Sequence, residues 1–385
     1  MMMLLLPLAA LVATSTTQAA PLSINTYPAG AVYTHPLDDQ RGVRSLVLQN
    51  AAVINNAAGA VTVDAVTIEL LRGGEVVDSR TLGAKDLERA AKAGKALQAS
   101  GQMALYGFQF GAVLGAPAAT LPGSARLEHG QGLLITQQVF AFNGARDELR
   151  ITTSASADGK TVREVRSTPI VTAASKIAYR FPLSGNWFAG AGASLHTAHR
   201  WAVPEEYALD IFRLGEGGHS FQGSGNAAKD YFAYGAKVMA AAPGKVVAVV
   251  DSMGEDSKLF RMPNETAAAY IQRVIELQDK VMAGGAAHAA GNFVVLDHGS
   301  GEYSHYAHLR PGSIKVKVGA TVEAGQALAE LGTSGMSTEP HLHFQVCNGP
   351  DPVTCAGIPV KFSNITLPLA DFPRSVQSGD FIDAN

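Results

Sequence analysis

Charged residues are scarce in this chain, and neither sign dominates. Only 16% of the 385 residues are Asp, Glu, Lys or Arg, and the formal net charge is −3. Binding to nucleic-acid phosphates needs clustered Lys and Arg, so this composition argues against a nucleic-acid partner. A hydrophobic fraction of 47% argues against disorder, and 40 glycines favour β structure with tight turns. The length suffices for about two domains.

A long hydrophobic run is missing everywhere except at the N-terminus. Residues 1–13 carry no charge, and small and polar residues follow as far as Ala20. Such a run is too short for a bilayer, which takes about 20 residues, but it matches a signal peptide with a small-residue cleavage site. We therefore expect residues 1–20 to be a signal peptide and the mature chain to be periplasmic or secreted, without a membrane span. A membrane anchor is the alternative, because no Lys or Arg precedes the run.

Cysteine is limited to Cys347 and Cys355. The stretch between them is rich in turn residues such as Asn348, Gly349 and Pro350, which can bring the two sulfurs together. In an oxidising compartment we expect a local disulfide. The alternative is a pair of thiolate metal ligands, but the spacing is too long for the usual short zinc knuckle.

Short segments with period-two alternation fill the chain from Ser23 to about Val171. This pattern, broken by Gly, Asn and Pro, is typical of an antiparallel β-sandwich with one buried and one wet face. Its clearest segments are residues 45–48, 61–64, 66–70, 133–136 and 149–152. One helix is expected from Ala84 to about Gln98. We expect residues 21–172 to form an accessory, sandwich-like domain.

A small and polar stretch from Ser167 to Ser175 indicates a domain boundary, and further short β segments predict a second domain over residues 173–385. Its strands are expected at residues 245–250, 292–297, 313–318 and 341–346, with turns at Gly319 and Gly325. A helix from about Asn264 to Met282 is inserted between them, and we expect it to dock on the sheet. The predicted fold class is therefore mainly all-β.

Two histidines stand two residues apart in the last β segment. On a strand such residues point to the same face, so His341 and His343 should project together while Leu342 and Phe344 enter the core. Side-by-side imidazoles indicate a metal site or acid–base chemistry.

Strand alternation and loop position give expectations for other histidines as well. By alternation, His305 should face away from the groups around His308. His35 is expected on the surface or in a loop.

Several stretches around these histidines resemble the lysostaphin-type (LytM-like) zinc metallopeptidases, which cut peptide bonds in bacterial cell walls. The closing stretch is residues 332–344 (GTSGMSTEPHLHF). Upstream lie residues 238–247 (VMAAAPGKVV), 291–299 (GNFVVLDHG), 306–309 (YAHL) and 319–328 (GATVEAGQAL). The resemblance is tight from Gly291 to Val346, patchy from about Leu195 to Asp251, and does not touch the N-terminal half.

The resemblance implies one zinc ion per chain, held by a His and an Asp from an early strand and by the second His of the closing stretch. His343 matches that last ligand, and Asp210 supplies the carboxylate. His308 and His341 match the family's two catalytic histidines that do not bind the metal.

The first ligand pair departs from the family pattern His-x-x-x-Asp. The nearest upstream histidines are His196 and His199, and ten residues separate His199 from Asp210. Ligands need only converge in space, so a loop between them is acceptable, and we favour His199 over His196.

Two imidazoles and one carboxylate leave an open position on zinc, which is typical of catalytic sites. The resemblance thus implies an exported zinc metalloendopeptidase that hydrolyses peptidoglycan, with zinc-activated water attacking the carbonyl and His308 and His341 assisting. The alternatives are a non-catalytic wall-binding or amidase-regulating protein on the same scaffold, and a secreted protease that acts on proteins. The long His199–Asp210 spacing keeps the non-catalytic alternative open.

Overall fold

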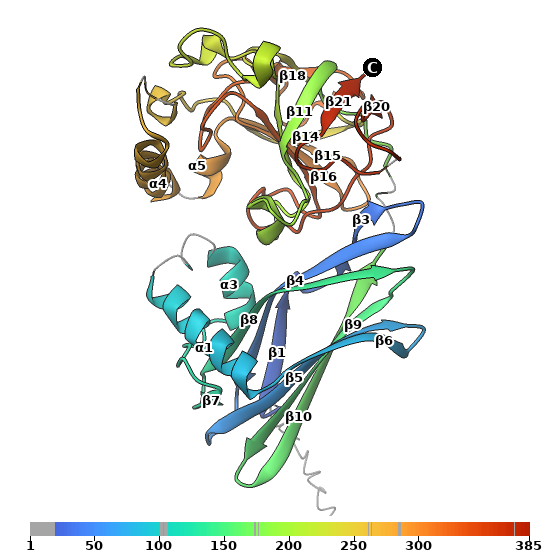
Figure 1. Ribbon diagram of the computed structural model, residues 1–385, viewed down its shortest axis with the longest axis vertical. Coiled ribbons are helices and arrows are strands. Elements are labelled where there is room, and N and C mark those ends of the chain that lie inside the picture. Colours follow the sequence, from blue (N-terminus) through green and yellow to red (C-terminus); the bar gives the residue numbers. More distant parts are fainter. Residues whose placement is uncertain are drawn as a thin grey trace, which may run out of the picture.

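The structure is a computed structural model that describes residues 20–100, 103, 107–172, 175, 177–260, 262, 264–283, 286–372 and 374–385. The expected signal peptide therefore lies outside the described residues, apart from Ala20. Strands predominate over helices in the described part, which confirms the mainly β fold class. Among the described helices, none is both long enough and apolar enough to cross a bilayer. Figure 1 shows the N-terminal sheets stacked below the C-terminal sheet along the long axis.

Two sheets pack face to face in the N-terminal half. The first contains β1 (Leu22–Tyr27), β4 (Val43–Asn55), β3 (His35–Asp38) and β8 (Gly132–Asn143). The second contains β2 (Val32–Tyr33), β10 (Lys160–Val171), β9 (Glu148–Ala157), β5 (Val61–Arg72), β6 (Glu75–Leu82) and β7 (Arg126–Leu127). Their pairing is antiparallel except between β10 and β2. Buried side chains from both sheets, such as Leu46 and Ile68, form one shared core between them.

Strand β4 departs from the expected pattern of one buried and one wet face, because almost all of it is buried. Leu46 and Leu48 lie in the sandwich core, whereas Ala52 and Ile54 belong to a smaller apolar cluster on α3 (Gly107–Leu114). The predicted helix is present as α1 (Ala84–Ala99) and packs on β8 and β5. Helices thus cover part of the face that the alternation left open to water.

A large sheet with strands of different lengths forms the centre of the C-terminal half. Its strands, in spatial order, are β17 (Thr321–Val322), β14 (Gly244–Val250), β15 (Phe293–Asp297), β16 (Tyr303–Ala307), β19 (Leu342–Cys347), β12 (Leu209–Phe212), β11 (Gly185–Ala191), β21 (Phe381–Ala384) and β20 (Ile365–Thr366). A separate pair is formed by β13 (Lys237–Met239) and β18 (Ala327–Glu330). One face of the large sheet carries the main core, which includes Leu296, Tyr306 and Phe344.

The prediction of a strand at residues 313–318 is wrong. This segment is irregular: Lys315 N–H donates to Leu328 O, and the next ladder-like bond to another neighbour comes only after the segment, from Gly319 N–H to Val246 O. Alternation of Ile and Val with Lys occurs here because one side of the segment packs on the core, without a ladder to a partner strand. The predicted turns at Gly319 and Gly325 are present, with φ of 92° and 80°.

The inserted helix is present as α4 (Ala267–Ala283), but it does not dock on the large sheet as expected. Its main neighbouring element is the short helix α5 (Ala286–Ala290), and the two lie together at one side of the C-terminal half (Figure 1). Ile271 and Ile275 of α4 are about half exposed. Short 3-10 turns complete the half: η1 (His199–Trp201), η2 (Glu216–Gly218), η3 (Ala228–Asp230) and η4 (Ser257–Leu259).

The two halves touch through β3, β4 and neighbouring residues. Asp39 pairs with Lys361 at 2.6 Å, and Tyr27 Oη donates to Thr354 O at 2.6 Å. The expectation that His35 lies on the surface or in a loop is wrong: it belongs to strand β3, and its side chain is buried at this junction, with its ring centroid 5.9 Å from that of Tyr207. Strand β3 pairs with β4, and β4 bonds to Arg200 of the C-terminal half through Ser45 and Gln49. The boundary near residue 172 stays a prediction.

Candidate metal centre

Neighbouring strands bring His343 and Asp210 together. Strand β19 lies between β16 and β12, and Asp210 of β12 is directly opposite His343 in the register. Directly opposed residues of antiparallel strands project from the same face, so the imidazole and the carboxylate meet. Leu342 and Phe344 are fully buried on the other face, as the alternation predicts.

The turn η1 supplies the third side chain of this group. His199 begins η1, and one potential ligand atom each from His199, Asp210 and His343 lie within 4.8 Å of one another. His196, the other histidine considered from the sequence, is exposed and lies outside this group in the described part of the chain. The ten intervening residues therefore fold back so that His199 and Asp210 meet.

Hydrogen bonds fix which nitrogen of His343 carries its hydrogen. The Gln345 side chain donates from Nε2 to Pro352 O at 3.0 Å, which leaves Oε1 facing His343. A carbonyl oxygen only accepts, so His343 Nε2 donates to it over 2.9 Å. The other nitrogen, Nδ1, then points at Asp210 Oδ1, 3.0 Å away.

His199 is held in the same manner with its nitrogens exchanged. Its Nδ1 donates to Ala208 O at 3.3 Å, and its Nε2 lies 3.2 Å from Asp210 Oδ2. Two imidazole nitrogens with lone pairs in the neutral ring and one carboxylate thus converge on one point, where only a cation or added protons relieve the repulsion. This donor set, with each imidazole anchored through its other nitrogen, fits a zinc ion with an open coordination position.

The other two predicted histidines lie beside this group. His341 Nδ1 donates to Glu339 O and His308 Nδ1 donates to Ser334 O, each at 2.8 Å. His341 Nε2 lies 3.4 Å from Asp210 Oδ1, and the centroids of the His308 and His341 rings are 4.7 Å apart. Both rings therefore present Nε2 as the nitrogen without a backbone partner.

The expectation that His305 faces away from the groups around His308 is wrong, since both line the same cavity. Strand alternation fails here because β16 ends at Ala307 and His308 has a φ of 60°. This left-handed conformation turns the His308 side chain back to the face that His305 occupies. Even so, His305 lies outside the His199, Asp210 and His343 group in the described residues.

The electrostatics of these side chains favour a charged Asp210. Burial tends to raise the pKa of this carboxyl, but the positive charges of His199 and His341 hold it well below its usual range. Burial tends to lower the pKa of His199, yet the Asp210 carboxylate raises it to about 9. Burial, together with the charge on His341, lowers the pKa of His308, so that ring is neutral. The carboxylate is therefore ionised, as a metal ligand must be.

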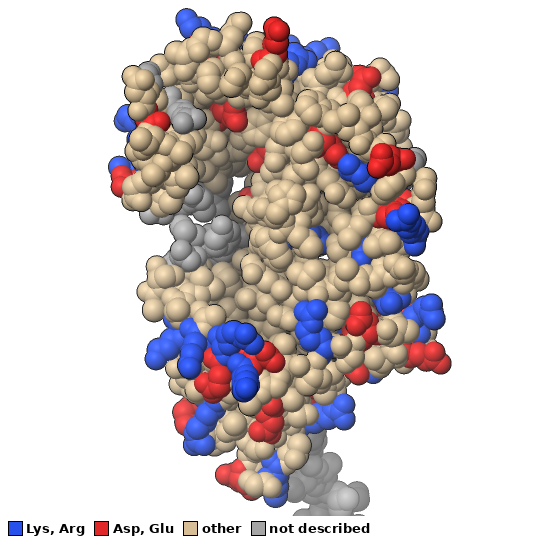
Figure 2. Space-filling model, viewed as in Figure 1, with Lys and Arg blue, Asp and Glu red and all other residues tan. Residues whose placement is uncertain are grey.

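A cavity of about 330 Å³ lies over these side chains. Besides the histidines and Asp210 its wall contains the polar residues Glu205, Thr338 and Gln345. The rest of the wall is apolar, with Ala289 and Ala290 of α5 and Phe293, Met336 and Val353 among its members. Among the described residues that line it, none comes from the N-terminal half. On the side of α4 and α5 the surface of the molecule is hollowed (Figure 2).

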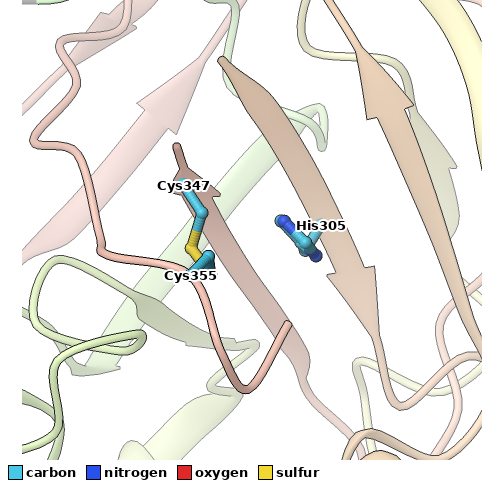
Figure 3. A group of neighbouring side chains, drawn as sticks. All are labelled: His305, Cys347 and Cys355. Atoms are coloured by element: carbon cyan, nitrogen blue, oxygen red, sulfur yellow. A yellow bond between two sulfur atoms is a disulfide. The ribbon is translucent and has the colours of Figure 1, made fainter. Parts of the chain in front are cut away.

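A second group of potential metal-binding atoms is formed by His305, Cys347 and Cys355 (Figure 3). The two sulfurs are joined in a disulfide, so they are not available as thiolate ligands. The disulfide instead lies beside Gln345, whose Nε2 is 3.2 Å from Cys347 Sγ. It thus borders the amide that orients His343.

The sequence reasoning missed two residues that support the site. Gln345 stands two positions after His343 on the same strand, so the alternation that grouped His341 with His343 also places Gln345 on that face. Arg200, next to His199, is fully buried, and no pattern in the sequence distinguishes it from a surface arginine.

Comparison with known proteins agrees with the resemblance seen in the sequence. Residues 266–355 match the model of Peptidase family M23, a stretch that contains His308, His341 and His343 but neither His199 nor Asp210. The peptidoglycan DD-endopeptidases ShyB and ShyA of Vibrio cholerae serotype O1 are 41% and 38% identical to this chain over 93 residues. That alignment covers 24% of this chain and 20% of each relative, so the chain spans about a fifth of the length of the curated relatives it matches.

Among solved structures, the catalytic domain of lysostaphin from Staphylococcus simulans is 21% identical, with a TM-score of 0.24. The similarity covers 45% of this chain and 88% of that one. The closing stretch with its two histidines and the strands just before it lie within the residues that match Peptidase family M23.

Proposed function

We propose that this chain is an exported zinc metalloendopeptidase that hydrolyses peptide bonds in bacterial peptidoglycan. The observation that carries the proposal is the convergence of His199 Nε2, His343 Nδ1 and the Asp210 carboxylate beneath a cavity that His308 and His341 also line. Peptidoglycan is proposed as substrate because the two Vibrio relatives that share this stretch are named peptidoglycan DD-endopeptidases. The periplasm or the extracellular space is the matching location.

The metal ligands in this proposal are His199, Asp210 and His343, which would hold one zinc ion per chain. When bound, zinc supplies polarisation of the scissile carbonyl and a more acidic water. Asp210 adds the negative charge that makes the site selective for a cation, and the hydrogen bonds to Ala208 O and Gln345 Oε1 keep both imidazoles pointing at it.

His308 and His341 act as the proton-transfer groups. Because Nδ1 of each donates to a backbone carbonyl, Nε2 of each is the basic nitrogen of the neutral ring. From this position Nε2 can take a proton from water and deliver it to the leaving amine. In its protonated form it can also stabilise negative charge on the carbonyl oxygen.

The domain division is part of the proposal, with residues 21–172 as an accessory domain and residues 173–385 as the peptidase domain. Its support is the separation of the two cores: one runs from Leu22 to Ile170 and the other from Tyr179 to Ala384. Each half thus buries its own apolar surface, as independent domains do.

The test is digestion of purified peptidoglycan by the full chain, with and without a chelator, followed by mass analysis of the released fragments. We expect monomers from cross-linked dimers, and we expect the chelator to abolish their release. Stem peptides freed from glycan would instead identify an amidase and contradict the endopeptidase assignment. Metal analysis of the purified protein should give about one zinc per chain.

Two matched variants test the ligand set. His199→Ala should lose both the zinc and the hydrolysis, whereas His196→Ala changes an exposed imidazole only three residues away and should retain both. Retention of zinc and activity by His199→Ala, or their loss in His196→Ala, would contradict the assignment of His199. Loss of activity with full zinc content in the His308→Ala and His341→Ala variants is expected, since neither is a ligand in this proposal.

A further inference from the structure

The segment between the first two proposed ligands has little regular structure of its own. After η1, residues 203–207 form turns, and ladder pairing begins only at Leu209. A free loop of this length would let His199 leave Asp210, because each unpaired residue gains about 1–2 kcal/mol of conformational freedom. Something other than β pairing must therefore hold the turn that carries His199.

Within the segment, the Arg200 side chain is the most deeply buried charge. Its relative exposure is 0%, and its guanidinium pairs with the buried carboxylate of Glu206. The guanidinium carbon also lies 5.0 Å from the centre of the Tyr207 ring. These contacts close the segment on itself, so the position of Arg200 fixes that of its neighbour His199.

Two residues of the N-terminal half bond to Arg200. Gln49 Nε2 donates to Arg200 O at 2.6 Å, and Arg200 Nη2 donates to Ser45 Oγ at 3.2 Å. Both Gln49 and Ser45 are 1% exposed and lie on β4, where they alternate with Leu46 and Leu48 of the sandwich core. A third bond joins the halves next to them, from Tyr207 Oη to Tyr33 O at 2.8 Å.

We propose that Ser45 and Gln49 of β4 are positioning residues of the metal centre: they hold the Arg200 segment so that His199 points at Asp210. The N-terminal sandwich supports the site from behind, and among the described residues it contributes nothing to the cavity wall. This inference rests on the proposed function, because it takes His199 as a zinc ligand.

The test compares two variants of the full chain. Gln49→Met keeps the length of the side chain but loses the donor, which leaves Arg200 O buried without its partner. Asp39→Asn is the matched control, since it weakens another contact between the halves, the ion pair with Lys361, which lies outside the metal cavity. Zinc affinity is measured by competition with a chromophoric chelator, and thermal unfolding reports whether each variant is folded.

Gln49→Met should bind zinc at least tenfold more weakly than wild type, a loss typical of mutations in residues that hold metal ligands in place. Asp39→Asn should bind zinc within twofold of wild type. The visible absorption bands of the cobalt-substituted protein should change in Gln49→Met but not in Asp39→Asn. If Gln49 only stabilised the fold, these bands would be the same in Gln49→Met as in wild type. Ser45→Ala, which loses only the bond to the Arg200 side chain, should show a smaller loss of affinity.

The outcomes separate this inference from the proposed function. A wild-type chain that binds no zinc overturns both. A wild type that binds zinc, with Gln49→Met folded and of equal affinity, overturns the positioning role alone. Should Gln49→Met fail to fold, an unchanged zinc affinity and cobalt spectrum in folded Ser45→Ala would also overturn it.

Discussion

The buried histidine at the junction of the two halves should make stability depend on pH. His35 is 2% exposed, and in the described part of the chain neither of its ring nitrogens has a hydrogen-bond partner. Burial lowers its pKa to about 3, helped by the positive charges of Arg200, Arg44 and Arg374. The folded protein therefore keeps this imidazole neutral over the whole range in which an unfolded chain would charge it.

The size of the effect follows from the two pKa values. Above pH 6.5, the ordinary histidine value, His35 is neutral in both states and contributes no pH dependence. As the pH falls below that value, the unfolded state takes up a proton that the folded state refuses until about pH 3. Stability is lost at about 1.4 kcal/mol per pH unit in this window, or about 2.7 kcal/mol at about pH 4.5.

The assay is urea unfolding of wild type and His35→Gln at about pH 7.5 and pH 4.5. Because Gln does not titrate, the variant should lose about 2.7 kcal/mol less of its free energy of unfolding between the two pH values. His288→Gln is the control, since it changes an exposed histidine on α5 and should follow wild type. A difference between wild type and His35→Gln below about 1 kcal/mol would refute the reasoning, because it would mean that folding does not exclude the proton.

Two further predictions concern the surroundings of the metal centre. Gln345→Leu removes the acceptor of the His343 Nε2–H, so zinc affinity in a chelator competition should fall about 10–100-fold. Gln345→Glu keeps an acceptor and should lose less affinity. Equal zinc affinities of the two variants would contradict the orienting role of Gln345. Gly335→Ala places a Cβ about 2.4 Å from Gly291 N, whereas Gly312→Ala, also at positive φ, meets open space. Thermal unfolding should therefore show a clearly larger loss for Gly335→Ala, and equal losses would contradict the close approach.

Hydrophobic periodicity predicts those strands and helices that bury one face and expose the other. Helix α1 was predicted over almost its observed length, and the strands around residues 245–250, 292–297 and 341–346 are present. The segment at residues 313–318 has the same alternation but no ladder, because alternation reports burial on one side and not the presence of a neighbouring strand. The burial of β4 on both faces could not be predicted either, since it depends on helices and loops from distant parts of the chain.

Some features of the site follow from local sequence spacing, and others depend on contacts between distant parts of the chain. His341 and His343 share a face through strand geometry, which sequence spacing encodes, and Gln345 was within reach of the same rule. His305 was misplaced because nothing in the sequence indicated the positive φ of His308. The burial of His35 depends on a contact between the halves, and no single-sequence pattern reports such a contact.

The long spacing between His199 and Asp210 is compatible with a metal site on energetic grounds. Lengthening the connection between two ligands from three residues to ten costs about 1 kcal/mol of loop-closure entropy, since this cost grows only with the logarithm of length. A hydrogen bond contributes about 0.5–1.5 kcal/mol, so the bonds from Gln49 and Ser45 to Arg200 suffice to offset that cost. The departure from the family spacing therefore does not weigh against zinc binding, provided that the N-terminal half remains packed on this segment.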